Sequence, residues 1–335
     1  MRGRVSPQFF LLAGLGLIYF ALIPFFYAGS KYFLNILITC SVLSLISMGV
    51  WITFALGLVN IGQAAFCTIG AYTTAILSAR YGLSFWLCLP LSGIVAAGVG
   101  MLIGMPILRL RGVYFAMITI SFGEAIRLLF MNGGSFTGGP DGIWGIPRPG
   151  QISLAGWTVV PAFTATDYLS FHYLAGLLLL ASLVIVWRLD RCRIGWIFRA
   201  IRQSDSLSAS VGIPIAKYRV IAFGASCFLG GIGGSFFAAY MTNIYPNSYT
   251  IGDSINFMLY CFLGGLQYLL GPVLGSFVLN GSFEVLRAFM KQEYQALFYA
   301  LVIIFTILWL PNGLLSLEIA GKEKREKNGI PDPGH

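Results

Sequence analysis

The stretch RLDRCRIGWIFRAIRQSDSLSASVGIPIAKYR, residues 188–219, separates two long apolar segments and holds seven of the 21 basic residues of the chain. Basic residues gather on the cytoplasmic side of membrane proteins, so this stretch predicts how the neighbouring segments are oriented. Within it, Trp196–Arg202 alternates apolar and cationic residues at a rough helical period, and Gly212 and Pro214 follow. We predict one or two short amphipathic helices along the membrane face, ended by this glycine and proline.

Two interpretations of this stretch remain open at this point. It is either a basic loop held to anionic lipid headgroups or a docking element for a cytoplasmic partner. The rest of the sequence has to decide between them.

Composition places the chain in a membrane. Of its 335 residues 57% are hydrophobic and only 10% are charged, whereas a soluble domain averages roughly 25% charged residues. The net charge of +9 arises from residues between apolar segments, so anionic lipid explains it better than nucleic acid does. The six cysteines and two histidines form no CxxC or Cys/His cluster, and we expect neither a disulfide scaffold nor a metal site.

The apolar segments predict an all-α membrane protein with ten transmembrane helices, since one such helix needs about 20 apolar residues. The expected spans are 9–28, 33–57, 61–79, 85–108, 112–131, 171–189, 218–241, 254–270, 271–289 and 294–312. Segments 61–79 and 254–289 are rich in glycine and can be either full spans or broken, re-entrant helices. The first segment lacks a cleavage site after its basic start, so we expect a retained anchor.

Ten spans also fit the charge distribution. With the N-terminus inside, fifteen basic residues lie in the cytoplasm and six lie elsewhere, and both termini are cytoplasmic. Setting aside the first and sixth spans leaves two four-helix units, about 33–131 and 218–312, that begin from opposite sides. Units of opposite orientation are typical of inverted-repeat transporters, whose sites lie near the membrane midplane on interrupted helices.

Several polar and charged residues within the spans are candidates for function. Glu124 with Arg127, and Glu284 with Arg287, form i,i+3 pairs that either neutralise themselves or line an outer vestibule. Polar and glycine residues predict a substrate pathway in the third span and, by the layout of the two units, a counterpart in the second unit. These pathway candidates are Asn60, Gly62, Gln63, Thr68, Gly70 and Tyr72, with Gly264, Gly265, Gln267 and Gly271. The alternative is that the glycines only allow helices to pack closely.

The chain lacks the sequence motifs of common enzymes. It has no G-x-x-x-x-G-K-[ST] phosphate loop, no H-E-x-x-H and no Ser/His/Asp constellation, so we expect no catalysis by this chain. It also has no line of carboxylates across several spans, which a proton-coupled carrier often shows. A uniporter or channel would leave the helical character of residues 188–219 unexplained.

Several motifs occur together and in one order. They are GLVNIGQAAFCTIGAY (57–72), RLRGVYFAMITISFGEAIRLL (109–129), FTGGPDGIWGIP (136–147), GWIFRAIRQSDSLSASVGI (195–213), AFGASCFLGGIGGSFFA (222–238), FLGGLQYLLGPVLGSFVL (262–279) and LPNGLL (310–315). From about Val42 to Leu317 the chain resembles the permease subunits of branched-chain amino acid ABC importers, a family that includes urea- and amide-type permeases.

The resemblance implies partners and a location. A homologous second permease lines the pathway with this one, two cytoplasmic ATPase subunits drive it, and a periplasmic or lipid-anchored binding protein delivers substrate. ATP and Mg would bind to the ATPase subunits, and this chain would carry no cofactor. The expected location is the bacterial inner membrane, where lipid surrounds a permease domain (1–317) with a cytoplasmic coupling loop (190–217), a periplasmic loop (132–170) and a charged cytoplasmic tail (318–335).

The resemblance also implies roles for particular residues. Ala209 and Gly212 stand where the family has its alanine–glycine signature, although Ser208 and Ser210 flank Ala209 where Ala or Glu is more usual. The residues expected to couple to an ATPase are Arg199, Arg202, Ala209, Gly212 and Ile213. The cations expected to seat a binding protein on the outer face are Arg148, Arg287 and Lys291.

The resemblance leaves the substrate open. It implies import of branched-chain or related hydrophobic amino acids, with urea, short amides or aromatic carboxylates as alternatives. A stand-alone secondary carrier is the alternative of another class, and it would transport without any ATPase.

Overall fold

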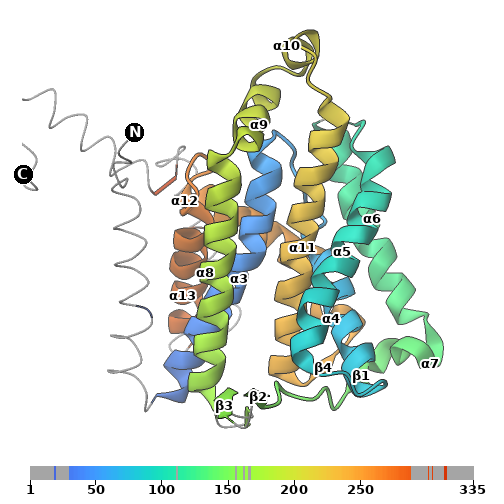
Figure 1. Ribbon diagram of the computed structural model, residues 1–335, viewed down its shortest axis with the longest axis vertical. Coiled ribbons are helices and arrows are strands. Elements are labelled where there is room, and N and C mark those ends of the chain that lie inside the picture. The colour runs from blue at the N-terminus through green and yellow to red at the C-terminus, as the bar shows by residue number, and fades with distance from the viewer. Residues whose placement is uncertain are drawn as a thin grey trace, which may run out of the picture.

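The computed structural model describes residues 19, 30–110, 112–154, 157–160, 163–164, 167–287, 301, 304 and 313–314. Long helices run side by side through most of these residues, with short elements at both ends of the bundle (Figure 1). Apart from a few isolated residues, the expected spans 9–28 and 294–312 lie outside the described residues, as does the tail 318–335.

Five helices in the described part of the chain are long and apolar enough to cross a membrane. They are α3 (Lys31–Ala55), α5 (Phe85–Ile107), α6 (Val113–Met131), α8 (Tyr168–Arg191) and α11 (Ile215–Met241). Each matches an expected span to within a few residues. The chain is therefore a helical, multi-pass membrane protein, while the count of ten spans and the inverted units stay predictions.

The glycine-rich segments form shorter helices. They are α4 (Gln63–Ala79), α12 (Ile251–Gly264) and α13 (Gly271–Arg287). At 14 residues α12 is about 21 Å long, which is less than the roughly 30 Å of a bilayer core. A Cβ added to Gly275 would lie nearer than 3.0 Å to the carbonyl oxygen of Tyr260, so α12 and α13 pack at backbone contact. Segment 254–289 is thus two helices joined by a turn at 265–270.

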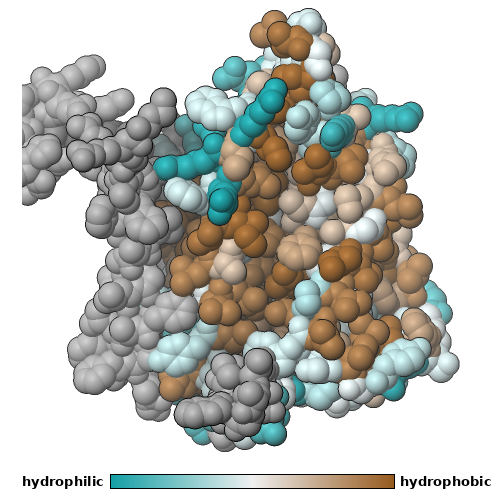
Figure 2. Space-filling model, in the orientation of Figure 1, coloured by the Kyte–Doolittle hydropathy of each residue, from teal (hydrophilic) through white to brown (hydrophobic). Residues whose placement is uncertain are grey.

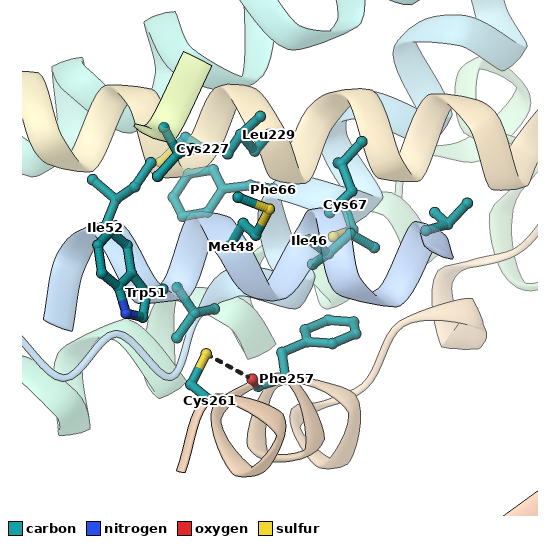
Figure 3. Packing of buried hydrophobic residues seen from close by; sticks show 14 of the residues in the cluster. Ile46, Met48, Trp51, Ile52, Phe66, Cys67, Cys227, Leu229, Phe257 and Cys261 are labelled. Carbon is teal, nitrogen blue, oxygen red and sulfur yellow. Dashed lines mark hydrogen bonds between the residues drawn. The ribbon is translucent and has the colours of Figure 1, made fainter. Parts of the chain in front are cut away.

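The core lies around α3 and α11. Within the most apolar stretch of each helix, 78% of the residues of α3 and 67% of those of α11 are buried, against 17% for α6. The two helices are antiparallel, because Tyr240 near the end of α11 donates to Asn35 near the start of α3 at 2.6 Å. Figure 3 shows side chains of α3, α4, α11 and α12 meeting between these helices, among them Met48, Phe66 and Leu229.

Glycine allows close helix contacts in this core. A Cβ on Gly70 of α4 would lie nearer than 3.0 Å to the backbone of Gly231 on α11, and a Cβ on Gly234 would meet the backbone of Cys67 in the same way. Small residues let helix backbones approach within a membrane bundle, where lipid provides no hydrophobic drive for association. These contacts fix α4 against α11.

The connection 132–170, which turn chemistry alone predicts to be loop, contains short elements. They are α7 (Gly134–Thr137), the 3-10 helix η2 (Gly139–Asp141), β1 (Ile143–Trp144), β2 (Ile152–Leu154) and β3 (Trp157–Val160). β2 and β3 form an antiparallel pair, and β1 pairs antiparallel with β4 (Asn243–Ile244), which follows α11. The β1–β4 pair joins this connection to the end of α11, although Ile143 and its partner Ile244 are 101 residues apart in sequence. The 3-10 helix η3 (Pro246–Ser248) follows β4.

Two short helices stand at the opposite end of the bundle, as the sequence predicts. They are α9 (Arg193–Gln203) and α10 (Asp205–Ser210), and α10 forms the tip of the molecule in Figure 1. Ser204 separates them and caps α10, because its hydroxyl accepts from the backbone N–H of Leu207 at 3.3 Å. We call α9, α10 and residues 211–213 the docking segment.

Candidate pathway junction and docking segment

Helix α4 begins inside the bundle rather than at its surface. Beyond the end of α3 the chain passes Gly57, which packs on Arg202 of α9, and then runs without helix to Gly62. The next residue, Gln63, contacts Ser226 near the middle of α11. Non-helical backbone at membrane depth needs polar partners, because lipid provides none. The side chains around residues 60–64 supply them.

Asn60 and Gln63 form a closed network with Ser226. The Asn60 amide donates to Gln63 Oε1 at 3.1 Å, and the Ser226 hydroxyl donates to the same oxygen at 3.0 Å. The Gln63 amide donates to the carbonyl oxygen of Ser226 at 2.9 Å, and Asn60 Oδ1 accepts from the backbone N–H of Gly62 at 2.9 Å. All three side chains are fully buried within this single chain.

Two more hydroxyl groups complete the start of α4. The backbone N–H of Ile61 donates to Thr119 of α6 at 3.3 Å, and that of Ala64 donates to Ser254 of α12 at 2.9 Å. The first turn of a helix has backbone N–H groups without partners in the helix, and Ser254 satisfies one of them, that of Ala64. Thr119 satisfies the N–H of Ile61 in the non-helical segment before the helix. We call Asn60, Gln63, Thr119, Ser226 and Ser254 the pathway junction.

The Ala64–Ser254 contact joins the first turns of two short helices that run to opposite ends of the bundle. α4 runs alongside α11 away from the docking segment, since Thr74 bonds to Ser235 at 2.6 Å. α12 runs toward the docking segment, because Cys261 bonds to Ser47 of α3 at 3.2 Å and Trp51 to Leu266 at 3.1 Å. α4 and α12 are the second helices of the two predicted units.

The other pathway candidates lie at different levels. Thr68 and Tyr72 are buried farther along α4, and the Tyr72 ring stacks on Phe130 of α6 with centroids 4.1 Å apart. Gly264, Gly265 and Gly271 form the tight turn between α12 and α13, where their backbones touch. Gln267 of that turn is exposed, so the structure does not bring it together with Gln63.

Gln267 instead lies beside two coupling candidates. It lines a pocket of about 460 Å³ together with Arg199 and Arg202 of α9, Asp190, and Trp51 of α3. Arg199 pairs with Asp190 at 3.1 Å, and its guanidinium lies over the Trp196 ring, 4.8 Å from the centroid. Residues predicted for pathway and for coupling thus meet at the end of the bundle that carries the docking segment.

The docking segment has one buried and one exposed face. Phe198 and Ile201 of α9 pack into the core. Leu207 and Val211, by contrast, are 68% and 74% exposed, and Figure 2 shows hydrophobic residues at the tip of α10. Ala209 is exposed beside them, and Gly212 adopts φ +80°, a conformation that glycine tolerates and L side chains rarely adopt. Ile213 is half-buried at the end of the segment.

A buried ion pair holds the docking segment to the bundle. Arg219 of α11 donates to Asp205 of α10 at 2.6 Å and to the carbonyl oxygen of Leu108, just after α5, at 2.9 Å. Sequence analysis did not select these two residues. Asp190 and Asp205 are the only acidic residues in 188–219. Two acids among so many cations are the sequence feature that could have indicated ion pairs in this stretch. Thr119, Ser226 and Ser254 were also missed, as single hydroxyl residues within apolar spans.

The charged candidates that the sequence predicts for the outer face are separated in the structure. Arg127 pairs with Glu124 at 2.5 Å and also donates to Asn247 at 2.7 Å, while Arg287 lies 3.6 Å from Glu284. Arg148 is half-buried in the connection between β1 and β2, and Arg287 is exposed at the end of α13. Lys291 lies outside the described residues.

Comparison with known proteins gives a family match over most of the chain. Residues 32–307 match the family described as branched-chain amino acid transport system / permease component. The chain is 36% identical over 275 residues to the high-affinity branched-chain amino acid transport system permease protein LivM of Salmonella typhimurium, and equally to that of Escherichia coli. Each alignment covers 78% of this chain and 64% of the relative.

A more distant relative matches along the whole chain. The autoinducer 2 import system permease protein LsrC of Klebsiella pneumoniae is 24% identical over 346 aligned positions, which cover 100% of this chain and 94% of that protein. No solved structure gives a significant match.

Proposed function

Because the chain belongs to the family of permease components of branched-chain amino acid transport systems, we propose that it is the membrane-spanning subunit of an ABC importer. Its substrate is a branched-chain or related hydrophobic amino acid, and ATP hydrolysis in partner subunits drives transport. The observation that carries this proposal is the docking segment, which presents apolar side chains beyond the basic end of the bundle. Exposed apolar residues on a polar end mark a protein contact.

The partners follow from this assignment. Two cytoplasmic ATPase subunits dock on the docking segments of this chain and of a second, homologous permease. A periplasmic or lipid-anchored binding protein delivers substrate to the opposite face, near Arg148 and Arg287. The complex lies in a bacterial inner membrane with both termini of this chain in the cytoplasm, since the basic residues gather at the end that carries α9 and α10.

The pathway junction is the proposed support of the substrate route. Two helices that begin within the bundle and run to opposite ends are the arrangement expected of inverted units around a central site. In the described conformation Asn60 and Gln63 are sealed within the chain, so substrate reaches this level only after α4 or α12 moves. We therefore assign the described conformation to a closed state of the proposed route.

Reconstitution tests the function. The chain, its second permease, both ATPases and the binding protein are placed in liposomes, and uptake of labelled leucine is measured with ATP inside. The proposal is supported if leucine uptake requires ATP and if urea, short amides and aromatic carboxylates do not inhibit it. Competition by one of those compounds reassigns the substrate, whereas uptake by the chain without ATPases establishes a secondary carrier.

A further inference from the structure

An apolar groove lies in the outer surface of the bundle, away from the pathway junction. It has a volume of about 360 Å³ and is lined entirely by apolar residues of α3, α5, α8 and α11. Met101 of α5, Ile185 and Leu189 of α8, and Ile221 and Ala225 of α11 are among them. Such a volume lies within the range of small-ligand sites, but its lining offers no polar group to orient a polar ligand.

The groove opens to the outside of the bundle. Ile185 is 55% exposed and Met101 is 38% exposed, although both line it. Figure 2 shows a broad hydrophobic band over the middle of the molecule, with hydrophilic residues above it toward the docking segment. In a membrane, an opening in such a band faces lipid acyl chains, so an acyl chain can enter the groove from the side.

Two cations stand between the groove and the docking segment. Lys217 precedes Ile221 by four residues on α11, so it lies on the same helix face about 6 Å nearer the basic end. Arg188 follows Ile185 by three residues on α8, also one turn nearer that end. Both side chains are exposed at the level where an apolar band meets headgroups.

Neither cation has an acidic partner among the described residues. The two acids nearby in sequence are already engaged, since Asp190 pairs with Arg199 at 3.1 Å and Asp205 with Arg219 at 2.6 Å. Arg188 and Lys217 therefore present two positive charges, one on each of two helices that flank the groove. Two cations beside an apolar groove favour a ligand that carries an anionic group joined to an apolar chain.

We propose that the groove and these two cations form a binding site for an anionic phospholipid. One acyl chain lies in the groove between α3, α5, α8 and α11, and the phosphate lies between Arg188 and Lys217. Basic pockets between membrane helices on the cytoplasmic side bind anionic headgroups in this way. A free amino acid fits less well, because its ammonium group would find no acceptor in the groove.

Lipid competition on the purified full-length chain tests the site. The chain is exchanged into detergent containing phosphatidylglycerol and phosphatidylcholine with identical acyl chains, and bound lipid is counted by native mass spectrometry. The wild-type chain should retain phosphatidylglycerol selectively. In the double variant Arg188→Gln/Lys217→Gln, the preference for phosphatidylglycerol over phosphatidylcholine should fall roughly thirtyfold, because each basic residue near a headgroup contributes a several-fold preference. The control Lys31→Gln/Arg109→Gln removes the same charge away from the groove and should retain the selectivity.

A second pair of variants tests the groove itself. Ile185→Trp fills the mouth of the groove from a position that is already half-exposed, so folding should be unaffected. Val184→Trp, at 57% exposure and outside the groove, is its matched control. Ile185→Trp should lower lipid retention while Val184→Trp should not, with both melting temperatures unchanged in phosphatidylcholine. Equal retention in both tryptophan variants, or in both charge variants, overturns the proposal. A structure of the assembled complex in which a second permease covers the groove and no lipid occupies it also overturns the proposal.

Discussion

The guanidinium of Arg219 bridges Asp205 of the docking segment, at 2.6 Å, and the carbonyl oxygen of Leu108, at 2.9 Å. One buried side chain thus joins α10 to the start of α11 and to the end of α5. A movement of α10 against the proposed ATPase subunit would pass directly to two helices of the bundle. The contact of Arg202 with Gly57, just before the pathway junction, gives the same segment a second connection.

Loss of one partner of this ion pair should be costly. Asp205→Asn leaves Arg219, only 7% exposed, as an uncompensated buried charge, which typically costs about 3–5 kcal/mol. We expect a lower melting temperature and loss of ATP-driven transport. The control is Asp190→Asn, whose partner Arg199 has a side chain that is 45% exposed and whose pair should contribute about 0–1 kcal/mol. Equal effects of the two variants would contradict a special role for the buried pair.

Charge on the exposed face of the docking segment should uncouple transport without unfolding the chain. Ala209→Glu places a carboxylate where we propose an ATPase groove, while the side chain stays in solvent in the free permease. We expect transport and substrate-stimulated ATP hydrolysis to fall at least tenfold, with an unchanged melting temperature. Tyr81→Glu, on a residue 69% exposed at the other end, is the control and should be active. Normal transport by Ala209→Glu would remove the docking role.

Gly70 should act through helix packing. A Cβ there meets the Gly231 backbone, which cannot move as a flexible side chain can, so Gly70→Ala should destabilise the chain by about 1–3 kcal/mol. Gly98→Ala on α5 meets nothing within 4 Å and should be neutral or stabilising by up to about 1 kcal/mol. The yield and melting temperature of the assembled complex measure this. A Gly70→Ala complex of normal yield with altered transport would favour the pathway role instead.

Thiol labelling should separate Gln63 from Gln267. After replacement of the exposed Cys192 and of the buried Cys67 and Cys261, a cysteine at exposed position 267 should react with a small polar reagent in the absence of ATP. A cysteine at position 63, which is sealed by Asn60 and Ser226, should react only during ATP turnover, and substrate should slow that reaction. Reaction rates with and without ATP are the measurement. If position 63 never reacts, the pathway junction is purely structural.

The outer cations should give a salt-dependent contact. Arg148→Ser/Arg287→Ser should weaken capture of the binding protein at low ionic strength, and the difference from wild type should shrink above about 0.5 M salt because the charges are screened. Affinity at a series of salt concentrations measures this. An unchanged affinity and salt slope would place the contact on another surface.

Local patterns in the sequence determine the spans and the docking segment. Runs of apolar residues predict α3, α5, α6, α8 and α11 to within a few residues, because hydropathy acts on each segment separately. The period of Trp196–Arg202 predicts α9 for the same reason. Gly212 marks the left-handed turn after α10, because glycine tolerates a positive φ. Motif order over most of the chain is likewise sufficient to indicate the family.

Only the tertiary structure decides which distant residues meet. Nothing local to Gln63 indicates that Ser226 satisfies its amide, or that Ala64 bonds to Ser254, 190 residues away. The same holds for Arg219 with Asp205 and for the β1–β4 pair. In each case a polar group needs a partner, inside the bundle or at one of its ends, and helix packing determines which partner is within reach. The sequence therefore specifies the helices, and their packing creates the junction, the ion pair and the groove.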